Sequence, residues 1–222
     1  MREEKQMTNA TKCTVTGHSG CMGTAENSLQ SIIASAENGA DITEIDLRFA
    51  KDGTPILTHD APKGNEVTLD AAFAKVSEYK SLLVNVDVKE CTEQLSQISG
   101  LAEKHGIADR IFFTGLFEED IPTAKKACPT VPCWLNMNVR PKILHTKIYL
   151  QRLVEKVKNT GTVGINMNKD NATKELVDLF HENGLQVSLW TVDDEDIMQK
   201  CIALSPDNIT TRYPDKLLKF LK

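Results

Sequence analysis

The feature that most constrains this 222-residue chain is a regular alternation of short β-rich runs with longer segments of helical period. Strands that alternate with helices of about ten residues predict parallel strands joined by right-handed crossovers. The runs expected to form strands are Cys13–Gly17, Thr43–Phe49, Pro55–Thr58, Leu82–Val88, Ile111–Thr114, Val131–Asn136, Val163–Asn166, Val187–Thr191 and Asn208–Thr210.

The segments between these runs carry helix signals. Ser28–Asn38 places its apolar residues three and four positions apart and is followed by Gly39, a residue that commonly ends helices. The same reasoning predicts six further helices: Ala71–Tyr79, Glu93–His105, Glu119–Ala127, Ile148–Asn159, Thr173–Asn183 and Asp194–Ala203.

The number of strands indicates the fold class. Pro55–Thr58 follows a KDG turn and is expected to be a hairpin partner, which leaves eight strands, the number in a (β/α)8 barrel of roughly 200–400 residues. An open doubly wound sheet is the alternative, but the glycines of GHSGCMG do not match the GxGxxG loop usual in that fold. We therefore predict an α/β protein with a single TIM-type (β/α)8 barrel domain over residues 1–222, with residues 1–11 as a flexible N-terminal tail.

Composition narrows the partners and the compartment. A formal net charge of −5 argues against nucleic-acid binding, which needs a basic face. The polar N-terminal residues lack the apolar run of a signal peptide, and no stretch approaches the roughly 18 apolar residues of a membrane span. Six cysteines without a CxxC pair suggest reduced thiols. We expect a cytoplasmic protein that acts on a small molecule, without nucleic acid or stable membrane insertion; its oligomeric state stays open.

Acidic side chains gather where predicted strands end, the edge at which barrels place their active sites. Glu44 and Asp46 share one face of a strand, about 7 Å apart, and Asp87 lies on the next strand. Carboxylates turned into a barrel lose hydration and repel each other, so they need a counter-charge. An oxygen-only site suits Mg²⁺ or Ca²⁺ better than zinc. The alternative is a metal-free ion network in which Glu44 and Asp46 pair with Arg48 and Lys89.

Two histidines, His18 and His59, follow strands near the same edge. A single histidine in such a position is commonly structural, but two beside a carboxylate cluster suggest an acid/base pair. Cleavage of a phosphodiester needs a base for the attacking hydroxyl and an acid for the leaving alkoxide, each contributing about 10²–10⁴-fold. A cation and a lysine would stabilise negative charge on the phosphoryl oxygens.

These motifs, in this order, resemble a known family. Residues 17–60, from GHSG to LTHD, are similar to the N-terminal signature of the glycerophosphodiester phosphodiesterase family, which belongs to the phospholipase-C-like phosphodiesterase superfamily of TIM barrels. That signature reads His-Arg-Gly, Pro-Glu-Asn-Thr, Glu-x-Asp, Lys-Asp-Gly and His-Asp. The resemblance continues through VNVDVK and ends in the segment from LQVSLWTV to ITTRYPDKL, so that it spans about Val15 to Leu217.

The resemblance implies hydrolysis of glycerophosphodiesters to sn-glycerol 3-phosphate and an alcohol, with one divalent cation, Ca²⁺ or Mg²⁺, as cofactor. By motif position it implies His18 and His59 as the acid/base pair, Glu44, Asp46 and Asp87 as metal ligands, and Lys89, Trp190, Glu26 and Asn27 as substrate-binding residues.

Departures from the family pattern leave alternatives open. Ser19 stands where the family has an arginine, which removes a fixed positive charge that Arg48 or the cation would have to replace. Only 26 residues separate Asp60 from Asp87, which indicates a short form without the subdomain often inserted there. The alternatives are a phospholipase D-like enzyme acting on lysophospholipids or sphingolipids, and a catalytically weakened barrel that binds phosphate esters. The attacking hydroxyl is either water or the substrate's own.

Overall fold

The computed structural model describes residues 13–137 and 146–222, so the expected tail at residues 1–11 lies outside the described residues. Nine strands in the described part form one sheet: β1 (Thr14–Gly17), β2 (Ile42–Phe49), β3 (Pro55–Leu57), β4 (Leu83–Val88), β5 (Ile111–Leu116), β6 (Cys133–Met137), β7 (Gly164–Asn168), β8 (Gln186–Trp190) and β9 (Asn208–Thr211).

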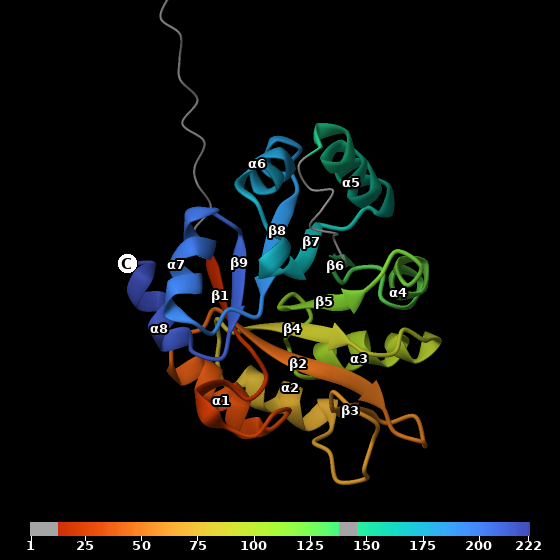
Figure 1. The fold of residues 1–222 in the computed structure, drawn as a ribbon. Helices are drawn as coiled ribbons and strands as arrows, with labels where there is room; N and C mark the ends of the chain where they lie inside the picture. Colours follow the sequence, from red (N-terminus) through yellow and green to blue (C-terminus); the bar gives the residue numbers. More distant parts are fainter. Residues whose placement is uncertain (1–12, 138–145) are drawn as a thin grey trace, which may run out of the picture.

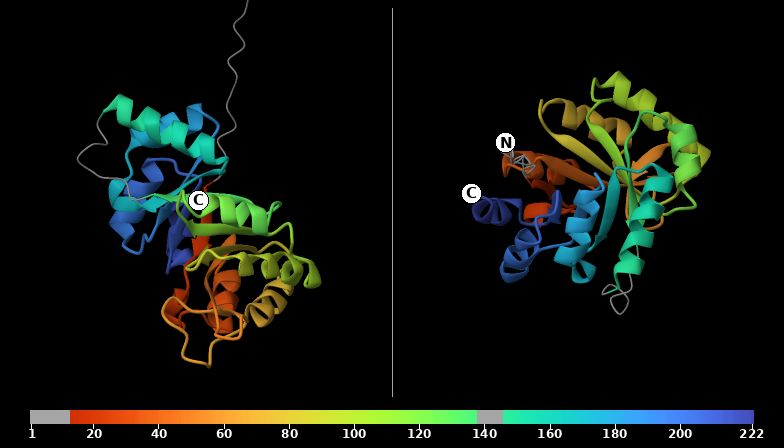
Figure 2. Two further views of the ribbon diagram at one scale, coloured as in Figure 1. Left: turned by 90° about the vertical axis from the view of Figure 1, so that its right-hand side faces the viewer. Right: turned by 90° about the horizontal axis from the view of Figure 1, so that it is seen from above.

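The sheet closes on itself as a barrel (Figure 1; Figure 2). Its order is β1-β9-β8-β7-β6-β5-β4-β2-β3, and β1 also pairs in parallel with β2. β3 is the exception, because it runs antiparallel to β2 with Leu57 opposite Leu47. All nine predicted strands are present, and the eight parallel strands form the TIM barrel that the alternation predicted.

Eight α-helices of the described part surround the barrel: α1 (Leu29–Glu37), α2 (Leu69–Ser77), α3 (Ser96–Lys104), α4 (Ile121–Ala127), α5 (Lys147–Thr160), α6 (Lys174–Glu182), α7 (Glu195–Ala203) and α8 (Pro214–Phe220). Four begin where a side-chain oxygen accepts a backbone N–H, as at Ser28 and Asp194. The sequence predicted all but α8, which has only two turns to display helical period. Within the described ranges, no helix combines the length and apolar character needed to cross a membrane.

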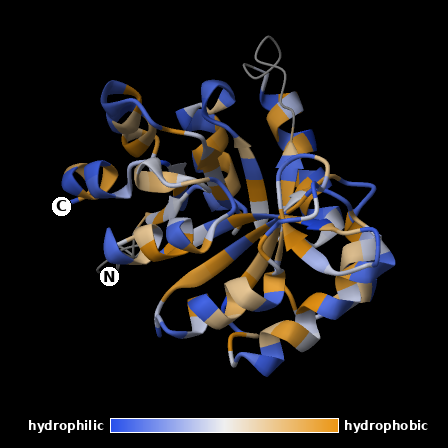
Figure 3. Cartoon of the chain, turned by 90° about the horizontal axis from the view of Figure 1, so that it is seen from below, coloured by the Kyte–Doolittle hydropathy of each residue, from blue (hydrophilic) through white to orange (hydrophobic). Residues whose placement is uncertain are grey.

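The two faces of each barrel strand differ in chemistry. On β2, Ile45 and Leu47 are buried in the apolar layer between strands and helices, whereas Glu44 and Asp46 line a cavity inside the barrel. Figure 3 shows strands with many hydrophobic residues, surrounded by helices of mixed hydropathy. Because successive side chains point to opposite faces of a strand, one alternating sequence supplies both the core and a polar interior.

Neutral polar side chains line much of the barrel interior. The Thr16 hydroxyl donates to Asn208 Oδ1 at 2.8 Å, and Asn208 Nδ2 donates to Ser188 Oγ at 2.9 Å. Between the neighbouring strands β6 and β7, Asn166 Nδ2 donates to Asn136 Oδ1 at 3.1 Å. These groups satisfy one another, as buried polar groups must. The interior between β5 and β9 is therefore polar without being charged.

Candidate active site

A cavity of about 430 Å³ opens at the carboxyl ends of the parallel strands. Eight of the nine residues that the sequence assigned to a site line it, and Asn27 is the exception. The lining residues are His18, Glu26, Glu44, Asp46, His59, Asn85, Asp87, Lys89, Thr114, Asn136, Asn166, Trp190, Thr191, Thr210 and Arg212. The barrel thus gathers groups from β1 through β9 in one place, at the edge expected for a barrel active site.

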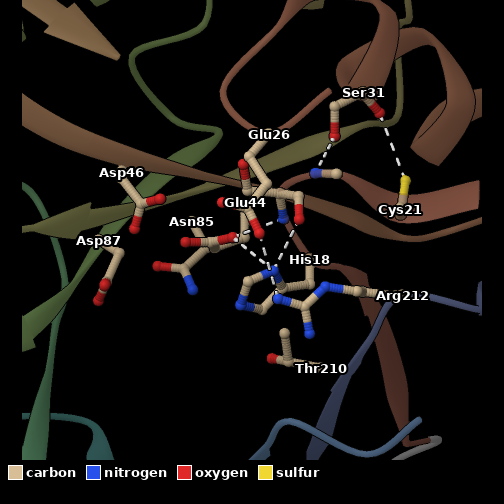
Figure 4. Close-up of polar contacts among 12 residues, drawn as sticks. His18, Cys21, Glu26, Ser31, Glu44, Asp46, Asn85, Asp87, Thr210 and Arg212 are labelled. Atoms are coloured by element: carbon tan, nitrogen blue, oxygen red, sulfur yellow. Dashed lines mark hydrogen bonds and ion pairs between the residues drawn. The ribbon is translucent and has the colours of Figure 1, made fainter. Parts of the chain in front are cut away.

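Three carboxylates form the centre of this cavity. Asp46 and Asp87 are register partners on β2 and β4, and Glu44 lies two residues before Asp46 (Figure 4). One oxygen of each of the three lies within 4.8 Å of the other two, so the group could hold a metal ion. Burial, and then the neighbouring charges of Asp46 and Asp87, raise the pKa of Glu44. An oxygen-only set of mutually repelling carboxylates fits a hard divalent cation.

Lys89 neutralises part of this negative charge. Its Nζ lies 2.8 Å from Asp46 Oδ1 and 2.5 Å from Asp87 Oδ2. Burial alone would lower the pKa of Lys89, but the attraction of Asp87 and Asp46 outweighs it and holds that pKa above its ordinary value. Glu44 instead accepts the backbone N–H of Ser19 at 2.7 Å. One lysine therefore serves two of the three carboxylates.

Arg48 does not join the carboxylates as the metal-free interpretation required. Its guanidinium pairs with Glu90, and its Nε donates to the carbonyl oxygen of His59 at 2.9 Å. The basic group nearest to Glu44 is His18, whose Nδ1 lies 3.8 Å from Glu44 Oε2. A network of Lys89 and Arg48 thus leaves Glu44 without a permanent cation, which favours a metal-binding interpretation of the cluster.

The loop after β1 orients Asp46. Asn27 Nδ2 donates to Asp46 Oδ2 at 2.7 Å, and the backbone N–H of Asp46 donates to Asn27 Oδ1 at 2.9 Å. The Asn27 N–H donates in turn to Ser19 Oγ at 2.6 Å. Ser19 is buried, at 1% exposed, and its hydroxyl fixes this loop through the bond from Asn27. Because a serine is neutral, it adds no charge to the cavity. Asn27 was expected among the substrate-binding residues, but its described contacts are with Asp46 and Ser19.

The two histidines lie on the same cavity with different neighbours. His18 Nδ1 lies 2.8 Å from the carbonyl oxygen of Ser19. A carbonyl only accepts, so Nδ1 carries the hydrogen and Nε2 keeps a lone pair in the neutral ring. His59 is more exposed, and its Nδ1 lies 3.0 Å from Asp60 Oδ1. The hydrogen bond from His59 lowers the pKa of Asp60, so the carboxylate stays charged beside the ring.

The cavity lining also includes Trp190, Glu26 and Arg212, a residue that the sequence analysis missed. Trp190 ends β8, and its buried Nε1 meets no protein acceptor in the described part of the chain. Arg212 follows β9 directly, and its Nη2 lies 3.4 Å from Glu26 Oε1. The signal that could have found Arg212 is the one that found His18: a polar residue immediately after a barrel strand.

A closed parallel barrel with clustered carboxylates and two imidazoles at its carboxyl edge defines an α/β-barrel enzyme. The sequence profile of the glycerophosphoryl diester phosphodiesterase family matches residues 16–102 and 63–216, two overlapping segments that together cover most of the chain. The chain therefore belongs to that family, as the motifs predicted.

Individual relatives agree with this assignment. A glycerophosphodiester phosphodiesterase from Bacillus altitudinis is 22% identical and covers 91% of this chain and 95% of its own. A Galdieria sulphuraria protein assigned the same activity superposes with a TM-score of 0.82 at 25% identity, covering 96% and 99%. An Oleispira antarctica phosphodiesterase in complex with its product sn-glycerol 3-phosphate superposes with a TM-score of 0.79 at 19% identity, covering 94% and 96%.

Proposed function

We propose that this protein is a divalent-cation-dependent phosphodiesterase that hydrolyses glycerophosphodiesters to sn-glycerol 3-phosphate and an alcohol. The observation that carries the proposal is a single cavity that joins the carboxylates of Glu44, Asp46 and Asp87 to the imidazoles of His18 and His59. Family membership, and the product bound to the Oleispira antarctica phosphodiesterase, support a small phosphate ester as the ligand. A cytoplasmic location stays a prediction.

Glu44, Asp46 and Asp87 would hold the cation, Mg²⁺ or Ca²⁺. When bound, such a cation supplies positive charge to the phosphoryl oxygens and offsets the repulsion among its ligands. Asn27 keeps the Asp46 carboxylate in place through its two hydrogen bonds. Lys89, in contact with Asp46 and Asp87, adds a permanent positive charge to the same side of the cavity.

The surroundings of the two imidazoles suggest separate roles. His18 offers the lone pair of Nε2, so it would accept the proton of the attacking hydroxyl. His59 Nδ1 contacts the Asp60 carboxylate, which orients the ring, so we assign His59 the donation of a proton to the departing alkoxide. One P–O bond forms to the attacking oxygen, and the P–O bond to the alcohol breaks as its oxygen gains that proton.

Trp190 and Glu26, which also line the cavity, would contact the substrate. Trp190 lines the cavity at the end of β8, and its ring would pack against the glycerol part of the substrate. Glu26 lines the same cavity and would accept from a glycerol hydroxyl. The short connection between Asp60 and Asp87 favours an open cavity with loose selection of the alcohol.

Turnover of glycerophosphocholine with Mg²⁺ or Ca²⁺, abolished by EDTA, is the first test. We expect His18→Ala and His59→Ala each to lower kcat about 100-fold or more, because each removes one proton-transfer group. His181→Ala on α6, outside the cavity, is the matched control and should leave kcat unchanged. Undiminished turnover in the first two variants would refute their assigned roles.

Two further assays separate the alternatives. Faster cleavage of lysophosphatidylcholine than of glycerophosphocholine would favour the phospholipase D-like activity, and phosphate-ester binding without turnover would favour a binding barrel. Reaction in ¹⁸O-labelled water distinguishes the attacking hydroxyl. Direct attack places label in the first-formed phosphate, whereas attack by the substrate's own hydroxyl gives a transient cyclic phosphate.

A further inference from the structure

Arg212 reaches the cavity from the end of β9, whereas Lys89 reaches it from the end of β4. Arg212 enters toward His18 and Glu26, whereas Asp46 and Asp87 enter from β2 and β4 (Figure 4). The Arg212 side chain is 36% exposed and lines the cavity, so it is accessible without being free in solvent. Within the part of the chain that the structure describes, Arg212 is the one arginine that lines this cavity.

Several contacts hold Arg212 in this orientation. The Asp193 carboxylate accepts from the Arg212 backbone N–H at 2.7 Å and from its Nη1 at 3.1 Å. The surrounding backbone is tied to the loop after β1, because the N–H of His18 donates to Thr211 O and the N–H of Met22 donates to Arg212 O, both at 2.9 Å. The guanidinium is therefore positioned before any ligand arrives, which lowers the entropy that binding would cost.

The unused donors of Arg212 matter for binding. Asp193 and Glu26 take one N–H each from the terminal nitrogens. The other guanidinium N–H groups have no protein acceptor within residues 13–137 and 146–222. A guanidinium presents five donors in a planar fork that matches two oxygens of a phosphate. Arg212 can thus bind a phosphoryl group while Asp193 continues to hold it.

The charge balance of the cavity shows why such a group is needed. Four carboxylates line it, and the permanent cations in the lining are Lys89 and Arg212. Lys89 is in contact with Asp46 and Asp87, so its charge is already offset. One divalent cation would bring the carboxylates and these two cations to neutrality. An anionic phosphodiester then still needs N–H donors that the carboxylates do not use. Lys89 keeps one of its three N–H groups after its two contacts, whereas Arg212, although paired with Asp193 and Glu26, keeps three of its five.

We propose that Arg212, held by Asp193, is the phosphate-binding arginine of this cavity and that it supplies the fixed positive charge that Ser19 cannot. The proposal rests on the proposed function, since it names the group that recognises the phosphate of that substrate. Asp193 does not line the cavity, so it acts as a positioning residue through Arg212.

The test measures KM and kcat for glycerophosphocholine and the inhibition constants of sn-glycerol 3-phosphate and inorganic phosphate. In Arg212→Gln, KM and both inhibition constants should rise about 10- to 100-fold, the range for loss of a charge-assisted hydrogen bond, while kcat changes less. Arg212→Lys keeps the charge but not the fork, so it should recover part of the loss. Asp193→Asn should give an intermediate rise.

Arg152→Gln, which removes an exposed arginine of α5 outside the cavity, is the control and should leave every constant unchanged. Thermal unfolding of each variant separates loss of binding from loss of fold, and Arg212→Lys and Asp193→Asn carry the test if Arg212→Gln fails to fold. Constants within twofold of the parent in folded Arg212→Gln, or in folded Arg212→Lys and Asp193→Asn together, would overturn the proposal.

Binding and turnover measured on the unsubstituted parent protein distinguish the proposed catalysis from the proposed role of Arg212. A parent that binds sn-glycerol 3-phosphate without turning over glycerophosphocholine, and that loses this binding in Arg212→Gln, contradicts the proposed catalysis and supports the phosphate-binding role. A parent that turns the substrate over while Arg212→Gln keeps its constants does the reverse. A parent that neither binds nor turns over contradicts both.

Discussion

The outward and inward faces of the barrel strands perform different tasks. Outward residues such as Ile45, Val86 and Phe113 are at most 1% exposed and belong to one apolar layer beneath the helices. Inward residues that line the cavity, such as Glu44 and Asn85, are also buried, at 5% exposed, but polar. Burial contributes roughly 25 cal/mol per Å² on the first face, whereas on the second it opposes the charges that the site needs. Stability therefore resides outside the barrel wall and chemistry inside it.

Neutralising an inward carboxylate should produce the largest effect on function without a matching loss of stability. Glu44→Gln keeps an acceptor for the Ser19 N–H but removes one metal-ligand charge. We expect metal affinity to fall more than about 100-fold and turnover about 10³-fold. Calorimetric titration with Mg²⁺ and Ca²⁺, together with a turnover assay, measures both.

The metal-free melting temperature of Glu44→Gln should be unchanged or higher, because burial and repulsion already disfavour the charged form of Glu44. Glu37→Gln, at the exposed end of α1, is the matched control and should leave metal binding unaltered. A Glu44→Gln protein that melts well below the parent would mean that the inward face also stabilises the fold, and the contrast between the faces would fail.

An outward substitution should give the opposite result. Phe113 on β5 is fully buried, so Phe113→Ala removes a large side chain and leaves a cavity, at a cost of about 3–5 kcal/mol of unfolding free energy. The folded enzyme should keep its KM and kcat, because Phe113 does not line the site. Urea denaturation and kinetics well below the melting temperature measure the two quantities.

Phe220→Ala tests whether burial causes this cost. Phe220 is also a phenylalanine, but it lies at the end of α8 and is 36% exposed, so its truncation should destabilise the fold much less. If Phe113→Ala impaired kcat in fully folded protein, the outward layer would have to influence the chemistry directly.

A third change affects the loop after β1, whose residue Asn27 holds the inward carboxylate of Asp46. Asn27→Gly removes the amide that holds Asp46, and glycine tolerates the positive φ of 54° at this position. We expect metal affinity to fall about 10- to 100-fold, the range for losing an outer partner of a ligand. Ser205→Gly, also at a positive φ but exposed and outside the cavity, controls for the glycine itself and should leave metal affinity unaltered.

The alternation of residue types predicted the faces, but not the contacts that cross the barrel. Glu44, Asp46 and Asp87 were expected inside because the period of a strand places Ile45 and Val86 against the helices. The Asn27–Asp46 and Arg212–Glu26 contacts join residues 19 and 186 positions apart, so they exist only once the strands that carry these segments have paired. Local pattern contains no information about such pairs.

The rim of the barrel was the hardest region to predict. Arg48 shares the strand parity of Asp46 and was considered as a partner for the carboxylates, yet it lies where β2 ends and Glu90 is available to it. Beyond the last strand residues, loops rather than the pleat decide where a side chain points. This applies to Arg212, one residue beyond β9, which the sequence analysis missed. Arg48 is still within β2, and its long side chain reaches Glu90 and the carbonyl oxygen of His59 instead of the carboxylates.

The smallest expected change in stability comes from a surface carboxylate, Asp70. Unlike Glu44, Asp70 forms an ion pair with a lysine. Asp70, in the first turn of α2, lies 2.7 Å from Lys104 Nζ and 2.8 Å from His105 Nε2. The hydrogen bond from Lys104, and then that from His105, lowers the pKa of Asp70. A carboxyl group with a lowered folded-state pKa stabilises the protein above its ordinary pKa of 3.8, and the contribution disappears as the pH falls through the folded value.

Asp70→Asn should therefore melt slightly below the parent at pH 7, by no more than a few degrees because solvent screens an exposed pair. The difference should narrow as the pH falls below 3.8, where the parent's Asp70 becomes protonated. Melting curves of both proteins across this range provide the measurement. Removal of a carboxylate charge thus affects stability differently at the two positions. It weakens the fold at Asp70, whose carboxylate pairs with Lys104 and His105. It does not at Glu44, in a cluster where one lysine contacts only the other two carboxylates. An Asp70→Asn protein more stable than the parent at pH 7 would show that charge balance does not separate the surface from the barrel interior.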